Sequence, residues 1–208
     1  MPSVTPYTST SGRPAPARAR AVALERRVLD ATERCLDRWG RAKVTVDDIA
    51  VEAGVSRATL YRMFPGGREV LFEALRVRRL EEFFTELRQA VQGATGLEDL
   101  LVRTVVHATG ELRADERLAA MLAAEPGEAL SDLTLAGLPR VVRMATVFLL
   151  PMLDPHLSRN EATRLVDLVS RLVISYFLAP SDHVDLGDPD SARAFLATFV
   201  LPSFTTRS

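Results

Sequence analysis

The 208-residue chain is predicted to be all-α, and three observations support this prediction. Apolar residues recur at spacings of three and four along most of the chain, which is the period of an amphipathic helix. Gly and Pro interrupt these stretches, for example at residues 65–67 and 126–127. Thr45 and Ser158 each precede an acidic residue by three positions, as in a helix-capping box. With 47% hydrophobic residues, the chain has enough apolar side chains for a core.

Segment 44–64, VTVDDIAVEAGVSRATLYRMF, predicts two short helices joined by a tight turn. Thr45 and Asp48 form the capping box of a helix that begins at Val46. Gly54 stands where a left-handed residue would end that helix, and Ser56 is a good N-cap for a second helix.

The outward face of the second helix has the composition of a DNA-binding surface. Leu60 and Phe64, four residues apart, are predicted to face inward. The outward residues include two arginines, a threonine and a tyrosine but no acid, which suits phosphates and base edges in a major groove. The alternative is a generic helical hairpin of an all-α protein. The residues predicted to bind DNA are Thr45, Val46, Ser56, Arg57, Ala58, Thr59, Tyr61, Arg62 and Arg68.

A long helix is predicted to begin at Arg68 and to continue to the region of Gln92. A cation in the first turn opposes the helix dipole, which favours acids there. We therefore expect an external phosphate to pair with Arg68.

The block from Val28 to the region of Leu75 resembles the DNA-binding domain of TetR-type bacterial repressors. The resemblance is carried by VTVDDIAVEAGVSRATLYRMFPGGREVLFEAL, which follows an amphipathic helix ending at Trp39-Gly40. It implies a DNA-binding regulator whose repression is relieved by a ligand. The rest of the chain is similar to the family only in length and helical character. Met63 departs from the pattern, because many members carry an aromatic residue or His there and so a phosphate donor.

The charge distribution also favours DNA binding by the first part of the chain. Residues 1–80 hold 15 Arg and Lys against 9 Asp and Glu, whereas residues 81–208 hold 11 against 18. A basic segment followed by an acidic one fits a nucleic-acid footprint at one end only. The single Cys35 is predicted to be a small core residue of a reducing compartment. No run of 18 apolar residues and no apolar signal core is present, so we expect a cytoplasmic protein without membrane contact.

The predicted domains are a disordered arm at 1–20, a helix-turn-helix DNA-binding domain at 21–68, and a ligand-binding and dimerisation domain at 69–208. Arg13, Arg18 and Arg20 of the arm either reach a minor groove or belong to a solvated leader. The helix at 21–39 should brace the helix-turn-helix, with Trp39 in the core.

Further helices are predicted at 97–113, 116–124, 138–153, 158–178 and 191–204. The helix at 138–153 is apolar on most sides, so it should be buried on most sides, either as plain core or as the wall of a cavity. Soft, large side chains with one Tyr and nearby arginines suit an apolar effector, with or without an anionic end. The residues predicted to bind it are Arg103, Thr104, His107, Met121, Met144, Phe148, Met152, Arg171 and Tyr176.

The last two apolar helices are predicted to pair with those of a second chain in a four-helix contact. The residues predicted at this homodimer interface are Leu165, Leu168, Leu172, Phe195 and Phe199.

The sequence favours a regulator over an enzyme. It contains no Ser/His/Asp set, no HExxH, no Glu-x-x-His pair and no Gly-rich phosphate loop followed by Lys. The acidic loop at 182–190 lacks the Gly and the terminal Glu of a calcium loop, so it is predicted to be solvated. We expect no cofactor and no metal. The leading hypothesis is a transcriptional regulator released from a palindromic operator by an apolar small molecule. The alternative is an all-α small-molecule-binding protein or enzyme without DNA binding.

Overall fold

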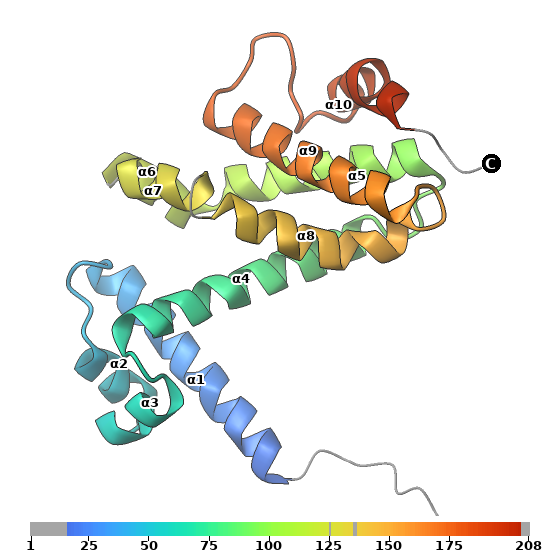
Figure 1. The fold of residues 1–208 in the computed structure, drawn as a ribbon. Helices are drawn as coiled ribbons and strands as arrows, with labels where there is room; N and C mark the ends of the chain where they lie inside the picture. The colour runs from blue at the N-terminus through green and yellow to red at the C-terminus, as the bar shows by residue number, and fades with distance from the viewer. Residues whose placement is uncertain (1–15, 125, 135–136, 205–208) are drawn as a thin grey trace, which may run out of the picture. The chain divides into compact units, whose positions relative to one another are not determined.

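The computed structural model describes residues 16–124, 126–134 and 137–204, which are helical and contain no strand. The chain divides into two compact units between Val77 and Arg78, within helix α4 (Figure 1). The helices that begin in the first unit are α1 (Pro16–Trp39), α2 (Val46–Ala53), α3 (Arg57–Met63) and α4 (Arg68–Ala90).

The core of the first unit is formed where α1, α2, α3 and the start of α4 meet. Val28 of α1, Ile49 of α2, Leu60 of α3 and Leu71 of α4 are all fully buried there. Leu60 and Phe64 face inward as predicted, and this leaves the opposite side of α3 exposed.

Two features of α1 differ from the prediction. It begins at Pro16, so residues 16–20 are helical rather than part of an arm. Pro is favoured at the first helical position, and the Ala and Arg that follow are strong helix formers. Trp39 was predicted to be core, but it is 40% exposed and its ring lies beneath Arg38, 5.3 Å from the guanidinium. The other residues of the predicted arm lie outside the described residues.

The second unit contains the rest of α4 and all later elements. These are α5 (Leu97–Ala114), α6 (Glu116–Ala124), α7 (Pro126–Leu133), α8 (Leu138–Leu153), α9 (Arg159–Leu178) and α10 (Pro189–Phe195), followed by the π-helical turn η1 (Leu196–Val200) and the 3-10 turn η2 (Leu201–Ser203). α7 was not predicted, because Pro126 was interpreted only as the end of α6. Pro also suits the start of a helix. The predicted last helix is regular only as far as Phe195.

α5 is the most enclosed helix of the second unit. It packs against α9 and α10, while α8 and α9 lie side by side (Figure 1). Only one face of α8 is buried, through Ala145, Leu149 and Leu153. Val147 is 68% exposed, so the prediction that α8 is buried on most sides is wrong within one chain. Among the described helices, each is too short or too polar to cross a bilayer.

Candidate nucleic-acid interface

The start of α2 is fixed by the capping box predicted from the sequence. The Asp48 N–H donates to Thr45 Oγ1 at 3.2 Å, and the Thr45 N–H donates to Asp48 Oδ2 at 2.9 Å. The Thr45 hydroxyl also donates to Asp48 Oδ2 at 2.6 Å. The bonds to Asp48 Oδ2 hold the pKa of the Asp48 carboxyl below its ordinary value, and the bond from the Thr45 hydroxyl contributes most. The backbone at Thr45 and Val46 is therefore ordered and partly exposed.

The turn between α2 and α3 also follows the prediction. Gly54 is left-handed, with φ 63°, and its N–H donates to carbonyls of α2. Ser56 Oγ accepts the Thr59 N–H at 3.1 Å and lies 2.9 Å from Thr59 Oγ1. Two hydroxyls are thus held together at the exposed start of α3.

Arg57 is the most prominent cation on the outward face of α3. Its Nη1 donates to Asp47 Oδ2 at 3.0 Å, and its guanidinium lies 5.6 Å from the centre of the Tyr61 ring. The pKa of Arg57 is raised above its ordinary value. Tyr61 makes the largest contribution to this increase, and Asp47 makes the next largest. Both members of the Arg57–Asp47 pair are about 60% exposed, so the pair is weak and a DNA phosphate or base can replace the carboxylate.

Tyr61 and Val46 meet at the turn that precedes α4. Gly67 is left-handed, with φ 67°, and a Cβ there would lie 3.2 Å from Tyr61 Cε1 and 3.6 Å from Val46 Cγ2. The absence of a side chain at Gly67 lets the turn approach α2 and α3 closely. Val46 of α2 and Tyr61 of α3, both predicted to bind DNA, therefore lie beside the same backbone turn at Gly67.

Arg68 has partners within its own chain. Its Nη1 donates to the Val44 carbonyl at 3.4 Å, and its Nε lies 3.4 Å from Glu69 Oε1. The guanidinium also lies 5.7 Å from the centre of the Phe72 ring. These contacts explain a cation in the first turn of α4, so its position does not by itself require the external phosphate that the sequence suggested.

Arg41 is a basic residue that the predicted set omits. Its Nη2 lies 3.2 Å from Glu69 Oε2, and its guanidinium lies 5.4 Å from the centre of the Phe72 ring. Arg41 and Arg68 therefore share both Glu69 and Phe72. From the sequence, Arg41 lies in the short connection after Gly40, a position suited to phosphates or to solvent.

Arg34 and Glu52 attach α1 to α2. Arg34 Nε donates to Glu52 Oε1 at 2.6 Å, and this bond is the main cause that lowers the pKa of Glu52. The bond joins α1 to α2 at the edge of the buried side of α1.

The sequence profile described as bacterial regulatory proteins, tetR family, matches residues 28–75, which include all of the residues whose contacts are described above. Residues 28–75 therefore match the TetR family. The chain is a DNA-binding transcriptional regulator rather than an enzyme.

Proteins of similar sequence or structure align with most of the chain. An uncharacterized HTH-type transcriptional regulator of Mycobacterium tuberculosis is 28% identical over 88% of this chain and 86% of its own length. The HTH-type transcriptional regulator BetI of Brucella suis is 28% identical over 84% of this chain and 88% of its own length. The crystal structure of the TetR family repressor AlkX from Dietzia sp. superposes with a TM-score of 0.62, at 26% identity over 86% of this chain and 94% of that chain.

In the second unit, several predicted ligand contacts lie at the core. Met144, Phe148 and Met152 of α8 are half-buried and pack against it, and the Phe148 ring stacks on Phe84 with centres 5.6 Å apart. Thr104 is buried, and its hydroxyl donates to the Leu100 carbonyl at 2.7 Å.

His107 of α5 and Met121 of α6, two further predicted ligand contacts, are both half-buried. His107 Nε2 is buried and has no hydrogen-bond partner among the described residues.

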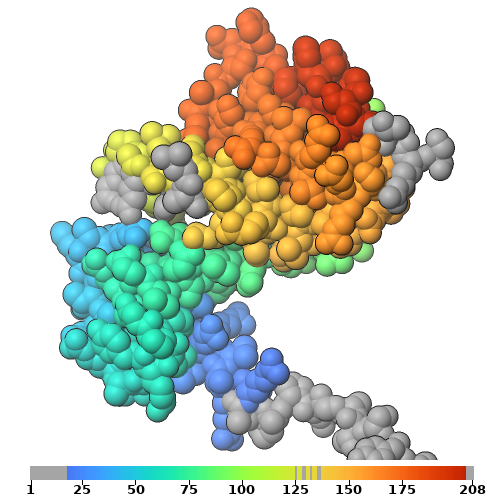
Figure 2. Space-filling view, viewed as in Figure 1, coloured from blue at the N-terminus to red at the C-terminus, as the bar shows by residue number. Residues whose placement is uncertain are grey.

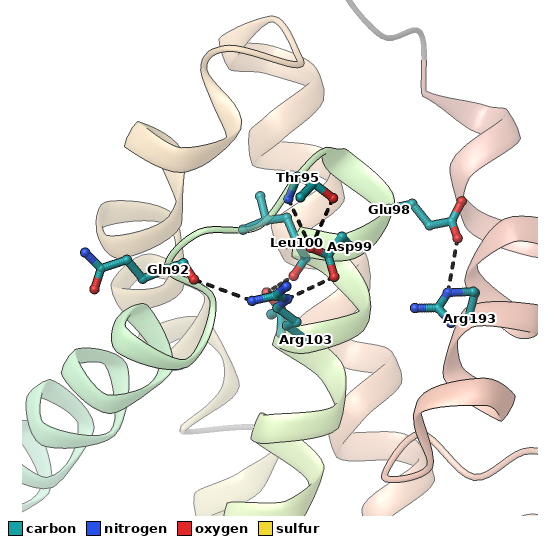
Figure 3. A network of polar contacts seen from close by, with 8 residues as sticks. Gln92, Thr95, Glu98, Asp99, Leu100, Arg103 and Arg193 are labelled. Atoms are coloured by element: carbon teal, nitrogen blue, oxygen red, sulfur yellow. Dashed lines mark hydrogen bonds and ion pairs between the residues drawn. The ribbon is translucent and has the colours of Figure 1, made fainter.

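Arg103, Arg171 and Tyr176 have other neighbours. Arg103 Nε donates to Asp99 Oδ1 at 2.9 Å, beside the Thr95 and Gln92 backbone (Figure 3). Arg171 donates twice to the Asp167 carboxylate, at 2.9 and 3.0 Å, and is 57% exposed. Both cations bond acids one helical turn away, and their contact with an anionic ligand stays a prediction. Tyr176 packs edge-on against Phe195, with centres 5.5 Å apart.

The residues predicted at the dimer interface divide into two groups. Leu165 is fully buried in its own chain, so it cannot contact a partner, and that prediction is wrong. Leu168 and Phe199 are exposed, while Leu172 and Phe195 are half-buried. The centres of the Phe195 and Phe199 rings lie 5.4 Å apart.

The acidic loop has structural partners. Asp185 Oδ1 lies 2.8 Å from Arg113 Nη2, and Asp188 caps α10 by accepting the Ser191 N–H at 2.8 Å. Among the described residues, no group of three or more potential ligands could hold a metal ion.

Proposed function

We propose that the chain is a homodimeric repressor that leaves a palindromic operator when an apolar small molecule occupies its second unit. The observation that carries the proposal is the outward face of α3, where Arg57 and Tyr61 lie exposed on a helix whose opposite side is buried. Two such faces in a dimer would read half-sites about 34 Å apart, one helical turn of DNA.

The proposed DNA contacts separate into two roles. Arg57 reads a base edge, because its guanidinium is exposed and its bond to Asp47 is replaceable. The other proposed DNA-binding residues contact the phosphate backbone and so orient the protein on the duplex. These are Thr45, Val46, Ser56, Ala58, Thr59, Tyr61, Arg62 and Arg68. The proposed DNA-binding part lies in the first compact unit, which ends at Val77, and the proposed ligand-binding and dimerisation part begins at Arg78.

The proposed effector is apolar because the half-buried residues of α8 offer thioether and aromatic surface without charge. Met144, Phe148 and Met152 pack against the core, and His107 Nε2, which is buried without a hydrogen-bond partner among the described residues, offers a polar group. AlkX, which is similar over 86% of this chain, is a repressor implicated in the biodegradation of n-alkanes. Long-chain hydrocarbons and their oxidised derivatives are therefore the first compounds to test.

The experiment begins with selection of bound duplexes from a random-sequence library by the full-length protein. Enrichment of a palindrome supports the proposal, and failure to enrich any sequence at moderate salt would refute it. The selected duplex is then titrated with n-alkanes, alkanols and fatty acids of increasing chain length, and its release is followed by fluorescence anisotropy.

A substitution links release to the second unit. Met144→Trp should weaken the effect of an active compound at least several-fold and leave DNA affinity unchanged, because residues 144 and 148 lie one helical turn apart on α8 and the bulky ring would occupy the proposed ligand site. Ala120→Trp, at an exposed position of α6, is the control. An effector response that is unchanged by Met144→Trp in a folded protein would place the ligand elsewhere.

A further inference from the structure

The first turns of α1 carry a cluster of arginines that does not pack on the rest of its unit. Residues 18–27 contain four arginines against one glutamate. All ten are exposed except Leu24, which is half-buried. Figures 1 and 2 show this part of α1 extending beyond α2 and α3. Because an isolated helix of this length is marginal in water, such an extension gains from a binding partner.

The charges of this extension are not neutralised within the described part of the chain. Arg18, Arg20, Arg26 and Arg27 form no ion pair there, whereas Arg34 on the same helix bonds Glu52. The extension therefore presents net positive charge to an external partner.

Helical geometry sorts the four arginines into two pairs. Arg20, Arg27 and Arg34 are spaced seven residues apart, close to two full turns, so they lie along one face of α1 at intervals of about 10.5 Å. Arg34 bonds Glu52 of α2, so this face borders α2 beside the buried face of α1. Arg18 and Arg26 lie on other faces, since one residue turns the helix by about 100°.

We propose that Arg20 and Arg27 form a second DNA contact, which binds phosphates of the duplex flanking the half-site read by α3. The proposal rests on the proposed function, because it assumes that the helix-turn-helix lies on DNA. A duplex carries one charge per about 1.7 Å, so arginines along a helix meet phosphates whatever the base sequence. A lipid surface fits less well, because Val22, at 60%, is the only exposed large apolar side chain of residues 18–27.

The test compares two double variants with the same change of charge in the full-length protein. Arg20→Ala/Arg27→Ala removes the proposed contact. Arg18→Ala/Arg26→Ala is the control on the same helix and preserves helix propensity equally well. The probes are the selected duplex cut to its palindrome and the same duplex with about ten more base pairs on each side. Affinity is measured as a function of salt by anisotropy.

The unmutated protein should bind the longer duplex more tightly than the shorter one. Arg20→Ala/Arg27→Ala should abolish this difference and lower the log–log salt slope by about 0.9 for each phosphate that the variant no longer neutralises. A fourfold rise in salt weakens binding roughly 3.5-fold for each neutralised phosphate, so the change is measurable. Arg18→Ala/Arg26→Ala should retain most of the flank effect, and Arg20→Lys/Arg27→Lys should retain the slope.

Equal decreases in affinity for the two alanine pairs would overturn the proposal, because they would indicate diffuse charge rather than one face. The proposal would also be overturned if Arg20→Ala/Arg27→Ala kept both the salt slope and the preference for the longer duplex. In either case, binding of the palindrome would leave the proposed function intact. A failure of the unmutated protein to bind any duplex would instead refute the proposed function.

Discussion

At the scale of single residues, exposed side chains of the first unit are held by partners that DNA can replace. Arg57 bonds Asp47 and lies over Tyr61, which orients the guanidinium before binding. An oriented arginine loses less conformational freedom on binding than a free one. The sequence identified Arg57 from its place on α3, but it could not show Asp47 as its partner, because that contact depends on how α2 packs against α3.

Arg57→Ala should relax operator specificity, because a bidentate contact of Arg with guanine contributes about 1–3 kcal/mol of discrimination. Arg68→Ala should instead weaken all duplexes alike and reduce the salt slope by about 0.9. Competition between the selected operator and a scrambled duplex measures both effects. An unchanged operator preference in Arg57→Ala would exclude the assigned role.

Asp48 should make the first unit sensitive to acid. Its pKa is lowered by Thr45 in the folded state, so its stabilising effect is complete above the unfolded pKa of about 3.9 and is lost as pH falls through the lower folded value. Asp48→Asn keeps an accepting oxygen but removes the charge. Its melting temperature should therefore fall less steeply below about pH 4 than that of the unmutated protein. Parallel curves for the two proteins would contradict this expectation.

At the scale of elements, the sequence predicted best what adjacent residues determine. The capping boxes at Thr45 and Ser158 placed the starts of α2 and α9 correctly, because their hydrogen bonds span only three residues. Exposure was predicted less well. Trp39 and Leu165 both continue apolar stripes, yet one is exposed and the other fully buried, because exposure depends on which elements cover each end of a helix.

Gly67 in the turn before α4 and Gly54 in the turn between α2 and α3 provide a matched pair of substitutions. Gly54 and Gly67 are both left-handed, so Ala at either position should cost about 1–2 kcal/mol of stability. Only at Gly67 would the new methyl group press on the Tyr61 ring, at 3.2 Å, whereas at Gly54 it would meet nothing within 4 Å. Gly67→Ala should therefore also weaken DNA binding, and Gly54→Ala should leave it unchanged. Thermal unfolding and anisotropy separate the two effects, and equal DNA affinities for the two variants would contradict the prediction.

At the scale of the whole molecule, the exposed apolar side chains require an explanation. Phe199 and Val147 are each 68% exposed, and Leu168 is 36% exposed. A stable homodimer commonly buries about 2,000 Å² or more in total, much of it apolar. The sequence predicted apolar helices near the C-terminus, but which side of each helix remains exposed follows from tertiary packing.

Leu168→Asp or Phe199→Asp should convert a dimer into monomers, because a charge buried without a partner costs several kcal/mol. Val147→Asp on α8 is the comparison. Light scattering at micromolar concentration measures the mass of each variant. If only Val147→Asp dissociated the dimer, the interface would lie on α8. If the unmutated protein were monomeric, the homodimer itself would be excluded.

The π-helical turn η1 has an evolutionary consequence. The Leu201 N–H donates to the Leu196 carbonyl five residues back, so this turn holds one residue more than an α-helical turn. Deletion of a single codon, for example that of Ala197, would restore regular winding and bring Leu201 into the buried position of Val200. One aliphatic residue would replace another, so the fold should survive. Related genes should therefore differ in length by one codon within residues 196–200 more often than in the regular helices, and such a change would rotate Phe199 relative to the surface that it now occupies.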